Sequence, residues 1–170
     1  IHGANDIVGA TGWMALIHPY TAEYDACGCF ESYASGTGIG SQARKLLRDT
    51  AGYSGVLSKK PIDEITSHDV FAALEADDPI AVQVLDKAIE LWGMATANLV
   101  SLFNPEKIIF GGGVFGPASR FIPRIYAEAC QWGQPISMKQ VEYRASELQG
   151  EAALLGAAHL ALRSLPKTEN

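Results

Sequence analysis

Three consecutive glycines, Gly111 to Gly113, directly follow a short apolar run in this sequence. The run, Lys107-Ile108-Ile109-Phe110, is typical of a strand buried on both faces of a parallel sheet. Open α/β sheets bind ligands at the carboxyl ends of parallel strands, and glycines leave the backbone bare there. The pattern therefore favours nucleotide binding at Gly111, Gly112 and Gly113, although a plain strand-to-helix turn would use the same residues.

Other side chains that could do chemistry are sparse. The sequence contains neither a Walker A phosphate loop nor the Gly-x-Gly-x-x-Gly fingerprint of dinucleotide-binding proteins. His68 and His159 have no sequence context that would suggest a catalytic triad. The cysteines, Cys27, Cys29 and Cys130, are few and odd in number, which suits a reducing cytoplasm better than a disulfide framework.

The glycine run must be held by neighbouring elements, and capping residues indicate where these begin. Asp78 and Pro79 predict a helix that continues to about Phe103, because Asp favours the N-cap and proline the first helical position. Ser67 is expected to cap a shorter helix. The spacing of apolar residues then predicts helices over residues 30–50, 68–76, 117–132 and 151–163 and further strands over residues 13–18 and 138–143.

The order of elements after Lys107 is strand, helix, strand, helix. Short connections in this order imply parallel pairing through right-handed crossovers. The predicted fold class is therefore α/β, with a partly parallel sheet flanked by helices.

Length and charge narrow the functional classes. The chain has 170 residues, is 48% hydrophobic and carries a formal net charge of −6, as expected of a single globular domain. The acidic balance and the lack of a basic run argue against nucleic-acid binding, and no apolar stretch is long enough to span a membrane. The sequence begins at Ile1 inside a continuing pattern, so we expect a fragment of a longer protein with a mobile tail over residues 166–170.

Three segments resemble motifs of the ROK family of sugar kinases and repressors. Residues 29–36 (CFESYASG) resemble the family's Cys-x-Glu-x-Tyr-x-Ser-Gly segment, residues 104–115 (NPEKIIFGGGVF) its adenosine-motif strand, and residues 150–158 its closing helix. They occur in the family's order over nearly the whole chain. The resemblance implies that residues 1–165 form the C-terminal lobe of an actin/hexokinase/RNase H-like ATPase fold whose N-terminal lobe is absent.

The resemblance also assigns residues to ligands. Gly112 and Gly113 match glycines that approach the nucleotide, and Glu31 matches a glutamate that accepts hydrogen bonds from sugar hydroxyls. A carboxylate can accept from two hydroxyls at once, and such charge-assisted bonds are strong. Without the resemblance, Glu31 would be read as a first-turn glutamate favoured by the helix dipole. The family's aspartate base and first phosphate loop would precede Ile1, so no catalytic residue is expected in this chain.

Two departures from the family pattern lie near the N-terminus. Residues 9–13 (GATGW) occupy the place of Gly-Glu-x-Gly-His, so Ala10 and Trp13 replace a sugar-binding glutamate and histidine. Trp13 is expected to fill core, with stacking on a sugar face as the alternative. The family's zinc site uses that histidine and three cysteines, of which only Cys29 matches cleanly, so we expect no zinc. Residues 36–40 (GTGIG) look like a phosphate loop but are expected to be a loosened helix start.

The resemblance implies one function and one alternative. The first is the nucleotide-binding lobe of an ATP-dependent kinase acting on a hexose or N-acetylhexosamine, with Mg²⁺ on the phosphates. The alternative is a non-catalytic sugar-sensing regulator of the same fold. The expected partners are the sugar, ATP and the missing lobe, together with further copies of the chain in a homo-oligomer, all in the cytoplasm. The isolated chain is expected to be inactive.

Overall fold

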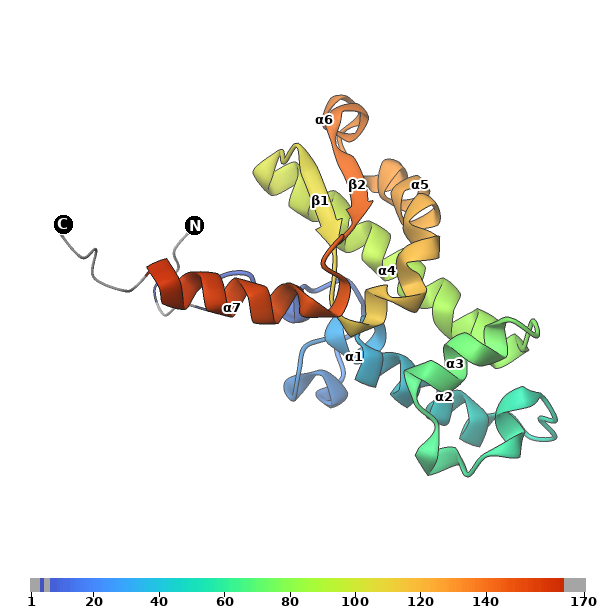
Figure 1. Cartoon of the computed structure of the whole chain (residues 1–170). Coiled ribbons are helices and arrows are strands. Elements are labelled where there is room, and N and C mark those ends of the chain that lie inside the picture. The colour runs from blue at the N-terminus through green and yellow to red at the C-terminus, as the bar shows by residue number, and fades with distance from the viewer. Residues whose placement is uncertain (1–3, 5–6, 164–170) are drawn as a thin grey trace, which may run out of the picture.

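The computed structural model describes residues 4 and 7–163, so the predicted mobile tail lies outside the described residues. A long helix, α4 (Pro79–Phe103), crosses the molecule, and most other elements pack along it (Figure 1). The other α-helices and strands are α1 (Glu31–Ala34), α2 (Gly36–Asp49), α3 (Ser67–Leu74), β1 (Lys107–Phe110), α5 (Ile122–Trp132), α6 (Pro135–Gln140), β2 (Glu142–Ala145) and α7 (Ala152–Arg163). Short 3-10 helices are η1 (Thr11–Trp13), η2 (Ala22–Asp25), η3 (Val56–Lys59), η4 (Ile62–Glu64), η5 (Gly113–Phe115), η6 (Pro117–Phe121) and η7 (Gln149–Glu151).

Both ends of α4 lie where the sequence predicts them. The Asp78 side chain accepts hydrogen bonds from the backbone N–H groups of Ile80 and Ala81, and Pro79 takes the first helical position. The helix ends at Asn104, whose left-handed backbone (φ +43°) stops the helical hydrogen bonding. The local signals at both ends therefore fix a 25-residue helix.

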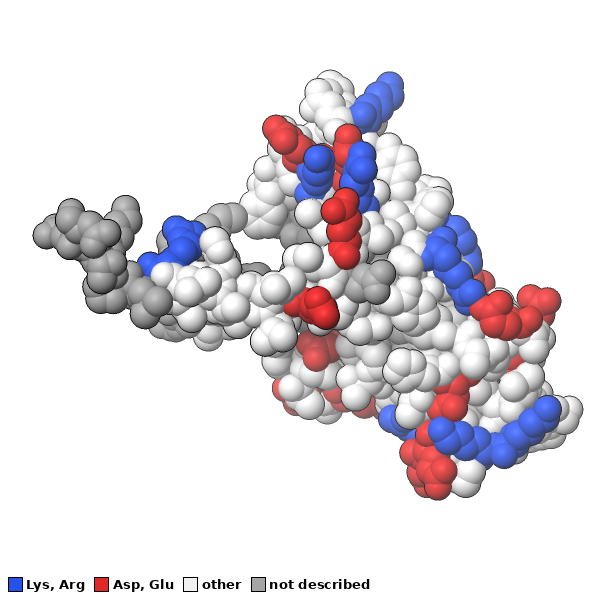
Figure 2. Space-filling model, viewed as in Figure 1, with Lys and Arg blue, Asp and Glu red and all other residues white. Residues whose placement is uncertain are grey.

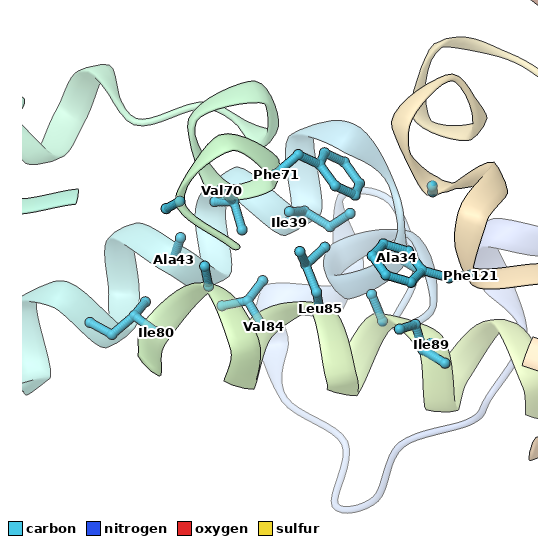
Figure 3. Close-up of a cluster of buried hydrophobic side chains, with 14 of the residues drawn as sticks. Ala34, Ile39, Ala43, Val70, Phe71, Ile80, Val84, Leu85, Ile89 and Phe121 are labelled. Atoms are coloured by element: carbon cyan, nitrogen blue, oxygen red, sulfur yellow. The ribbon is translucent and has the colours of Figure 1, made fainter. Parts of the chain in front are cut away.

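The main core lies between α4 and the helices α1, α2 and α3. Figure 3 shows Val84 and Leu85 of α4 facing Ile39 of α2, with Val70 of α3 beside them. Ile39 and Val70 are fully buried. Burial of these aliphatic side chains is the principal stabilising term for this half of the chain.

The sheet consists of β1 and β2, paired in parallel with Lys107 opposite Glu142 and Phe110 opposite Ala145. The predicted parallel pairing is confirmed. The helix α5 connects the two strands and packs on α4, where Gly93 allows close approach because an added Cβ would lie 2.6 Å from Cβ of Glu128. This arrangement places the end of β1, and the glycines after it, beside the middle of α4.

Two predictions about β1 and β2 are wrong. Residues 138–140 belong to α6, because the Gln134 side chain caps that helix and Pro135 starts it, so β2 begins only at Glu142. The strand β1 is not buried on both faces: Ile109 is 65% exposed, and within the described residues β2 is the only strand paired with it. Only Phe110 of β1 is fully in the core.

The N-terminal half also differs from the sequence prediction in detail. Residues 13–18 form no strand; the segment instead continues from η1 as irregular chain. The predicted helix over residues 30–50 is interrupted at Ser35, which caps α2 by accepting from the N–H of Gly38. Thr66, not Ser67, caps α3 through a capping box with Asp69.

The surface carries both signs of charge. Figure 2 shows Lys and Arg side chains beside Asp and Glu side chains over the face that it displays, and Arg120–Glu75 and Arg124–Asp86 form ion pairs. Figure 1 shows α7 projecting from the body, and its described residues after Ala152 are exposed. Across residues 4 and 7–163, none of the helices combines the length and hydropathy needed to cross a membrane.

Asp78 ties the loop before α3 to the start of α4. The residue is 2% exposed, and its carboxylate accepts hydrogen bonds from the N–H groups of Ile80 (3.0 Å), Ala81 (3.2 Å) and Val56 (2.7 Å) and from the Tyr53 hydroxyl. Burial alone would raise the pKa of Asp78, but the hydrogen bonds from these four groups outweigh burial and lower that pKa. The ionised carboxylate therefore stabilises the folded state.

We expect Asp78→Ala to lower the free energy of unfolding by about 2–4 kcal/mol, because four donors lose their acceptor. Urea unfolding at neutral pH measures this loss. The folded pKa lies below the unfolded value, so the contribution of Asp78 is complete above about pH 4 and disappears as the pH falls through the folded pKa. Between the unfolded and the folded pKa the wild type should lose stability with falling pH more steeply than Asp78→Ala. If the free energies of unfolding of the wild type and Asp78→Ala changed equally with pH, the lowered pKa assigned to Asp78 would be contradicted.

Candidate functional site

A cavity of about 440 Å³ lies where the end of β1 faces the start of α1. Glu31 lines it from one side and Gly111, Gly112 and Gly113 from another, although about 80 residues separate them in the sequence. Trp92 links α4 to α1, because its indole N–H donates a hydrogen bond to the Ala34 carbonyl oxygen (3.1 Å). The remaining lining residues are Thr11, Gly12, Phe30, Ala34, Ser35, Trp92, Ala95, Thr96, Leu99, Ile108, Ile109, Phe110, Val114 and Phe115.

Glu31 is the first residue of α1, and its carboxylate lies against the backbone of Gly12. A Cβ atom added at Gly12 would collide with Oε2 of Glu31 and would lie 3.0 Å from its Cβ. Within the described residues the structure shows no hydrogen bond or ion pair to this exposed carboxylate. Among the described residues that line the cavity, Glu31 is also the only ionisable one. Its carboxylate is therefore free to accept hydrogen bonds from a bound molecule.

The three glycines differ in what the fold requires of them. A Cβ atom added at Gly111 would lie 3.4 Å from Cβ of Ser146, which is an ordinary van der Waals contact, so the fold leaves room for a side chain there. Gly112 has φ +85°, a conformation that L side chains rarely adopt, so the turn itself requires glycine there. The backbone of Gly113 has no such positive φ, and a Cβ atom added to it would meet no protein atom within 4 Å. The fold therefore does not explain Gly113, whereas close approach of a ligand would.

A second cavity, of about 300 Å³, is also lined by Gly113. Its lining comes from α2, α3 and the segment after β1: Gly36, Ser67, His68, Phe71, Gly113, Val114 and Pro117. The sequence prediction missed this cavity, because His68 shows no distinguishing pattern and the three segments are far apart in the chain. Gly113 thus lines both cavities.

The segment over residues 36–40 is the regular first turn of α2 and not a loosened helix start. Two of its glycines allow helices to touch. A Cβ atom added at Gly38 would lie 2.7 Å from the carbonyl carbon of Ser32, and one at Gly40 would lie 3.3 Å from the backbone of Thr66. These glycines are therefore explained by packing between α1, α2 and α3.

The residues around Cys29 do not fit a zinc site. Zinc in structural sites takes four ligands in a closed tetrahedron. Across residues 4 and 7–163, no three His, Cys, Asp or Glu side chains are grouped so that they could share a metal ion. Trp13 is 57% exposed, so the prediction that it fills core is wrong; its backbone, not its ring, packs against Gly28.

Comparisons with protein families, curated proteins and solved structures all identify similar proteins. A family model described as the ROK family matches residues 1–164. A glucokinase from Halalkalibacterium halodurans is 30% identical over 162 residues, which cover 94% of this chain and 49% of that protein. A ROK family glucokinase from Streptomyces griseus, solved in complex with glucose and AMPPNP, has a TM-score of 0.68 at 30% identity, covering 81% of this chain and 46% of that one. A xylose repressor from Caldicellulosiruptor bescii is 24% identical over 164 residues, covering 92% of this chain and 41% of the repressor.

These relatives confirm the predicted α/β fold, which is that of the actin/hexokinase-like ROK proteins. The chain spans about half the length of the curated relatives it matches. The relatives include both glucokinases and a xylose repressor, so similarity alone does not select one activity.

Proposed function

This chain belongs to the ROK family, and from that premise we propose that residues 1–165 are the C-terminal lobe of an ATP-dependent sugar kinase. The observation that carries the proposal is that Glu31 and the glycine run, which match the family's sugar and nucleotide motifs, line one cavity. The similarity to glucokinases supports it, since one of them was solved with glucose and an ATP analogue.

In this proposal each of the two cavities binds a different substrate. A hexose or N-acetylhexosamine lies in the larger cavity, where Glu31 accepts hydrogen bonds from its hydroxyls. The nucleotide passes over Gly113, and the cavity lined by His68 and Phe71 receives the nucleoside. Gly113 then marks the boundary at which the phosphates face the sugar.

In this proposal the residues of the chain orient the sugar and ATP and do not transfer a proton. Phosphoryl transfer is catalysed mainly by orientation and charge stabilisation, and Mg²⁺ bound to ATP neutralises charge on the phosphates. We infer that the ion enters with ATP, because Mg²⁺ commonly binds through substrate phosphates and only one or two carboxylates. The base that deprotonates the sugar hydroxyl would come from an N-terminal lobe in a protein of full ROK length. Such a protein would act in the cytoplasm, and a homo-oligomeric state stays a prediction.

The isolated 170-residue chain is expected to show no sugar-kinase turnover, because the base would come from an N-terminal lobe, and Glu31, the one ionisable group among the described residues that line the larger cavity, is assigned to sugar binding. A coupled assay of ADP release with glucose and N-acetylglucosamine measures this. The control is a protein of full ROK length that carries this chain, which should turn over. Turnover by the isolated chain would contradict the two-lobe proposal.

A sugar-sensing regulator is the second candidate. The similarity to a xylose repressor favours it, as do Ala10 and Trp13 at two positions where the family motif has sugar-binding residues. The assay above separates the two candidates when the full-length protein is titrated with the same sugars. Sugar binding without ADP release in that protein would favour the regulator.

A further inference from the structure

The turn that carries Gly12 is fastened to the start of α1 by a thiol. Cys29 is 7% exposed, and its Sγ donates to the carbonyl oxygen of Met14 (2.9 Å) and accepts from the N–H of Leu16 (3.3 Å). We call this pair of hydrogen bonds the Cys29 bridge. It joins residues 14–16 to the residue that lies two positions before Glu31.

Glycines bring the two segments into backbone contact. Gly28 has φ +84°, and a Cβ atom added to it would collide with the carbonyl oxygen of Gly12 and lie 2.7 Å from Cα of Trp13. Gly12 in turn leaves no room for a side chain beneath the Glu31 carboxylate. Gly12 is therefore enclosed between Gly28 on one side and Glu31 on the other.

The ROK motif has a zinc site in this region, but the donors present in this chain do not fit a metal. Trp13 stands where the motif has its histidine. The sulfur of Cys27 lies 3.4 Å from Oγ of Ser32, and the sulfur of Cys29 is used by the bridge. As stated above, the described residues hold no group of three candidate ligands.

We propose that the Cys29 bridge and the Gly12–Gly28 contact replace a metal in this chain and set the Glu31 carboxylate in the larger cavity. Gly12 and Cys29 are thus positioning residues for the sugar contact, an inference that rests on the proposed function. A glutamate side chain loses rotamer freedom when it binds a ligand, and a backbone surface that already holds it reduces that loss. Sugar binding should then be independent of metal.

The first test is metal dependence. In a protein of full ROK length that carries this chain, we expect metal analysis to find zinc far below one ion per chain, and chelation with EDTA to leave glucose affinity and melting temperature unchanged. Stoichiometric zinc whose removal weakens glucose binding would overturn the proposal.

The second test asks whether Gly12 acts through Glu31. Gly12→Ala should weaken glucose binding about tenfold, because the added methyl displaces the carboxylate from its position. AMPPNP affinity should be unchanged, and Gly156→Ala in exposed α7 is the matched control. In the Glu31→Ala background, which leaves no carboxylate for the methyl to displace, Gly12→Ala should weaken glucose binding no further. Additive effects in this cycle would show a role unrelated to Glu31 and would overturn the proposal.

The third test concerns the thiol. Cys29→Val, which removes both hydrogen bonds at similar volume, should weaken glucose binding, and Cys29→Ser should restore part of it. If Cys29→Val fails to fold, the glucose affinity of Cys29→Ser and the Gly12–Glu31 double-mutant cycle test the positioning role instead. Wild-type affinity in Cys29→Val would overturn the bridge. Failure of the wild type to bind any hexose or N-acetylhexosamine would instead overturn the proposed function, and the positioning role with it.

Discussion

Replacing Glu31 with glutamine is expected to weaken sugar binding by about 10- to 100-fold, since a hydrogen bond to a charged group is worth about 1.5–3 kcal/mol. Glu31 is the only ionisable side chain among the described residues that line the larger cavity. The motif positions that would share its task hold Ala10 and Trp13, which cannot accept a hydroxyl proton in that role. The remaining carboxylate should therefore carry a large part of sugar recognition.

Calorimetric titration with hexoses and N-acetylhexosamines, in a protein of full ROK length that carries this chain, measures the effect. Glu64→Gln is the matched control, because it removes the same charge from an exposed site in η4 that does not line the cavity. If Glu31 serves only as a first-turn residue of α1, Glu31→Gln would cost a few tenths of a kcal/mol of stability and leave sugar binding unchanged. Equal affinities for every sugar that binds would end the claim that Glu31 contacts sugar.

The sequence predicts best where local chemistry decides the structure. The bounds of α4 follow from Asp78, Pro79 and Asn104, each of which acts on the backbone within its own turn. The parallel pairing of β1 and β2 follows from a short strand–helix–strand order that allows few other connections.

Prediction fails where the outcome depends on distant partners. The stretch over residues 138–143 is too short for its apolar pattern to separate a strand from a helix, and the structure buries Met138 in α6 and Val141 directly after it, beside α4 and α5. The β-branched residues of β1 indicate a strand, yet the exposure of Ile109 depends on what covers that face. Trp13 shows the same limit, because its size suggests core while its backbone contact with Gly28 leaves the ring exposed.

In the candidate site, too, the sequence predicts individual residues, whereas their arrangement depends on tertiary packing. The resemblance to family motifs supplied Glu31 and the glycine run as separate residues, and the packing of α1 against α4 brings them to one cavity. The cavity lined by His68 and Phe71 had no sequence signal, because α2, α3 and the segment after β1 contribute to it without a shared motif. The tertiary arrangement also distinguishes Gly112, which the turn requires, from Gly113, which it does not.

That distinction makes Gly113 the sharpest test of nucleotide binding. Gly113→Val is expected to weaken nucleotide binding roughly 5- to 150-fold, as estimated from the cost of about 1–3 kcal/mol for forcing a side chain into occupied space. The side chain would meet no protein atom within 4 Å, so the fold itself should accommodate it. Gly112→Val is a poor test, because φ +85° would strain any side chain there and confound the result.

Titration with AMPPNP in a protein of full ROK length that carries this chain measures the loss, and Gly113→Ala provides an intermediate size. Affinity should fall in the order Gly, Ala, Val, while glucose affinity and melting temperature stay near those of the wild type. A fall in melting temperature of the same order would point to a structural role for the glycine instead. Unchanged nucleotide affinity in Gly113→Val would reduce the glycine run to a turn between β1 and η5, because this glycine, which the fold does not require, would then have no ligand to explain it.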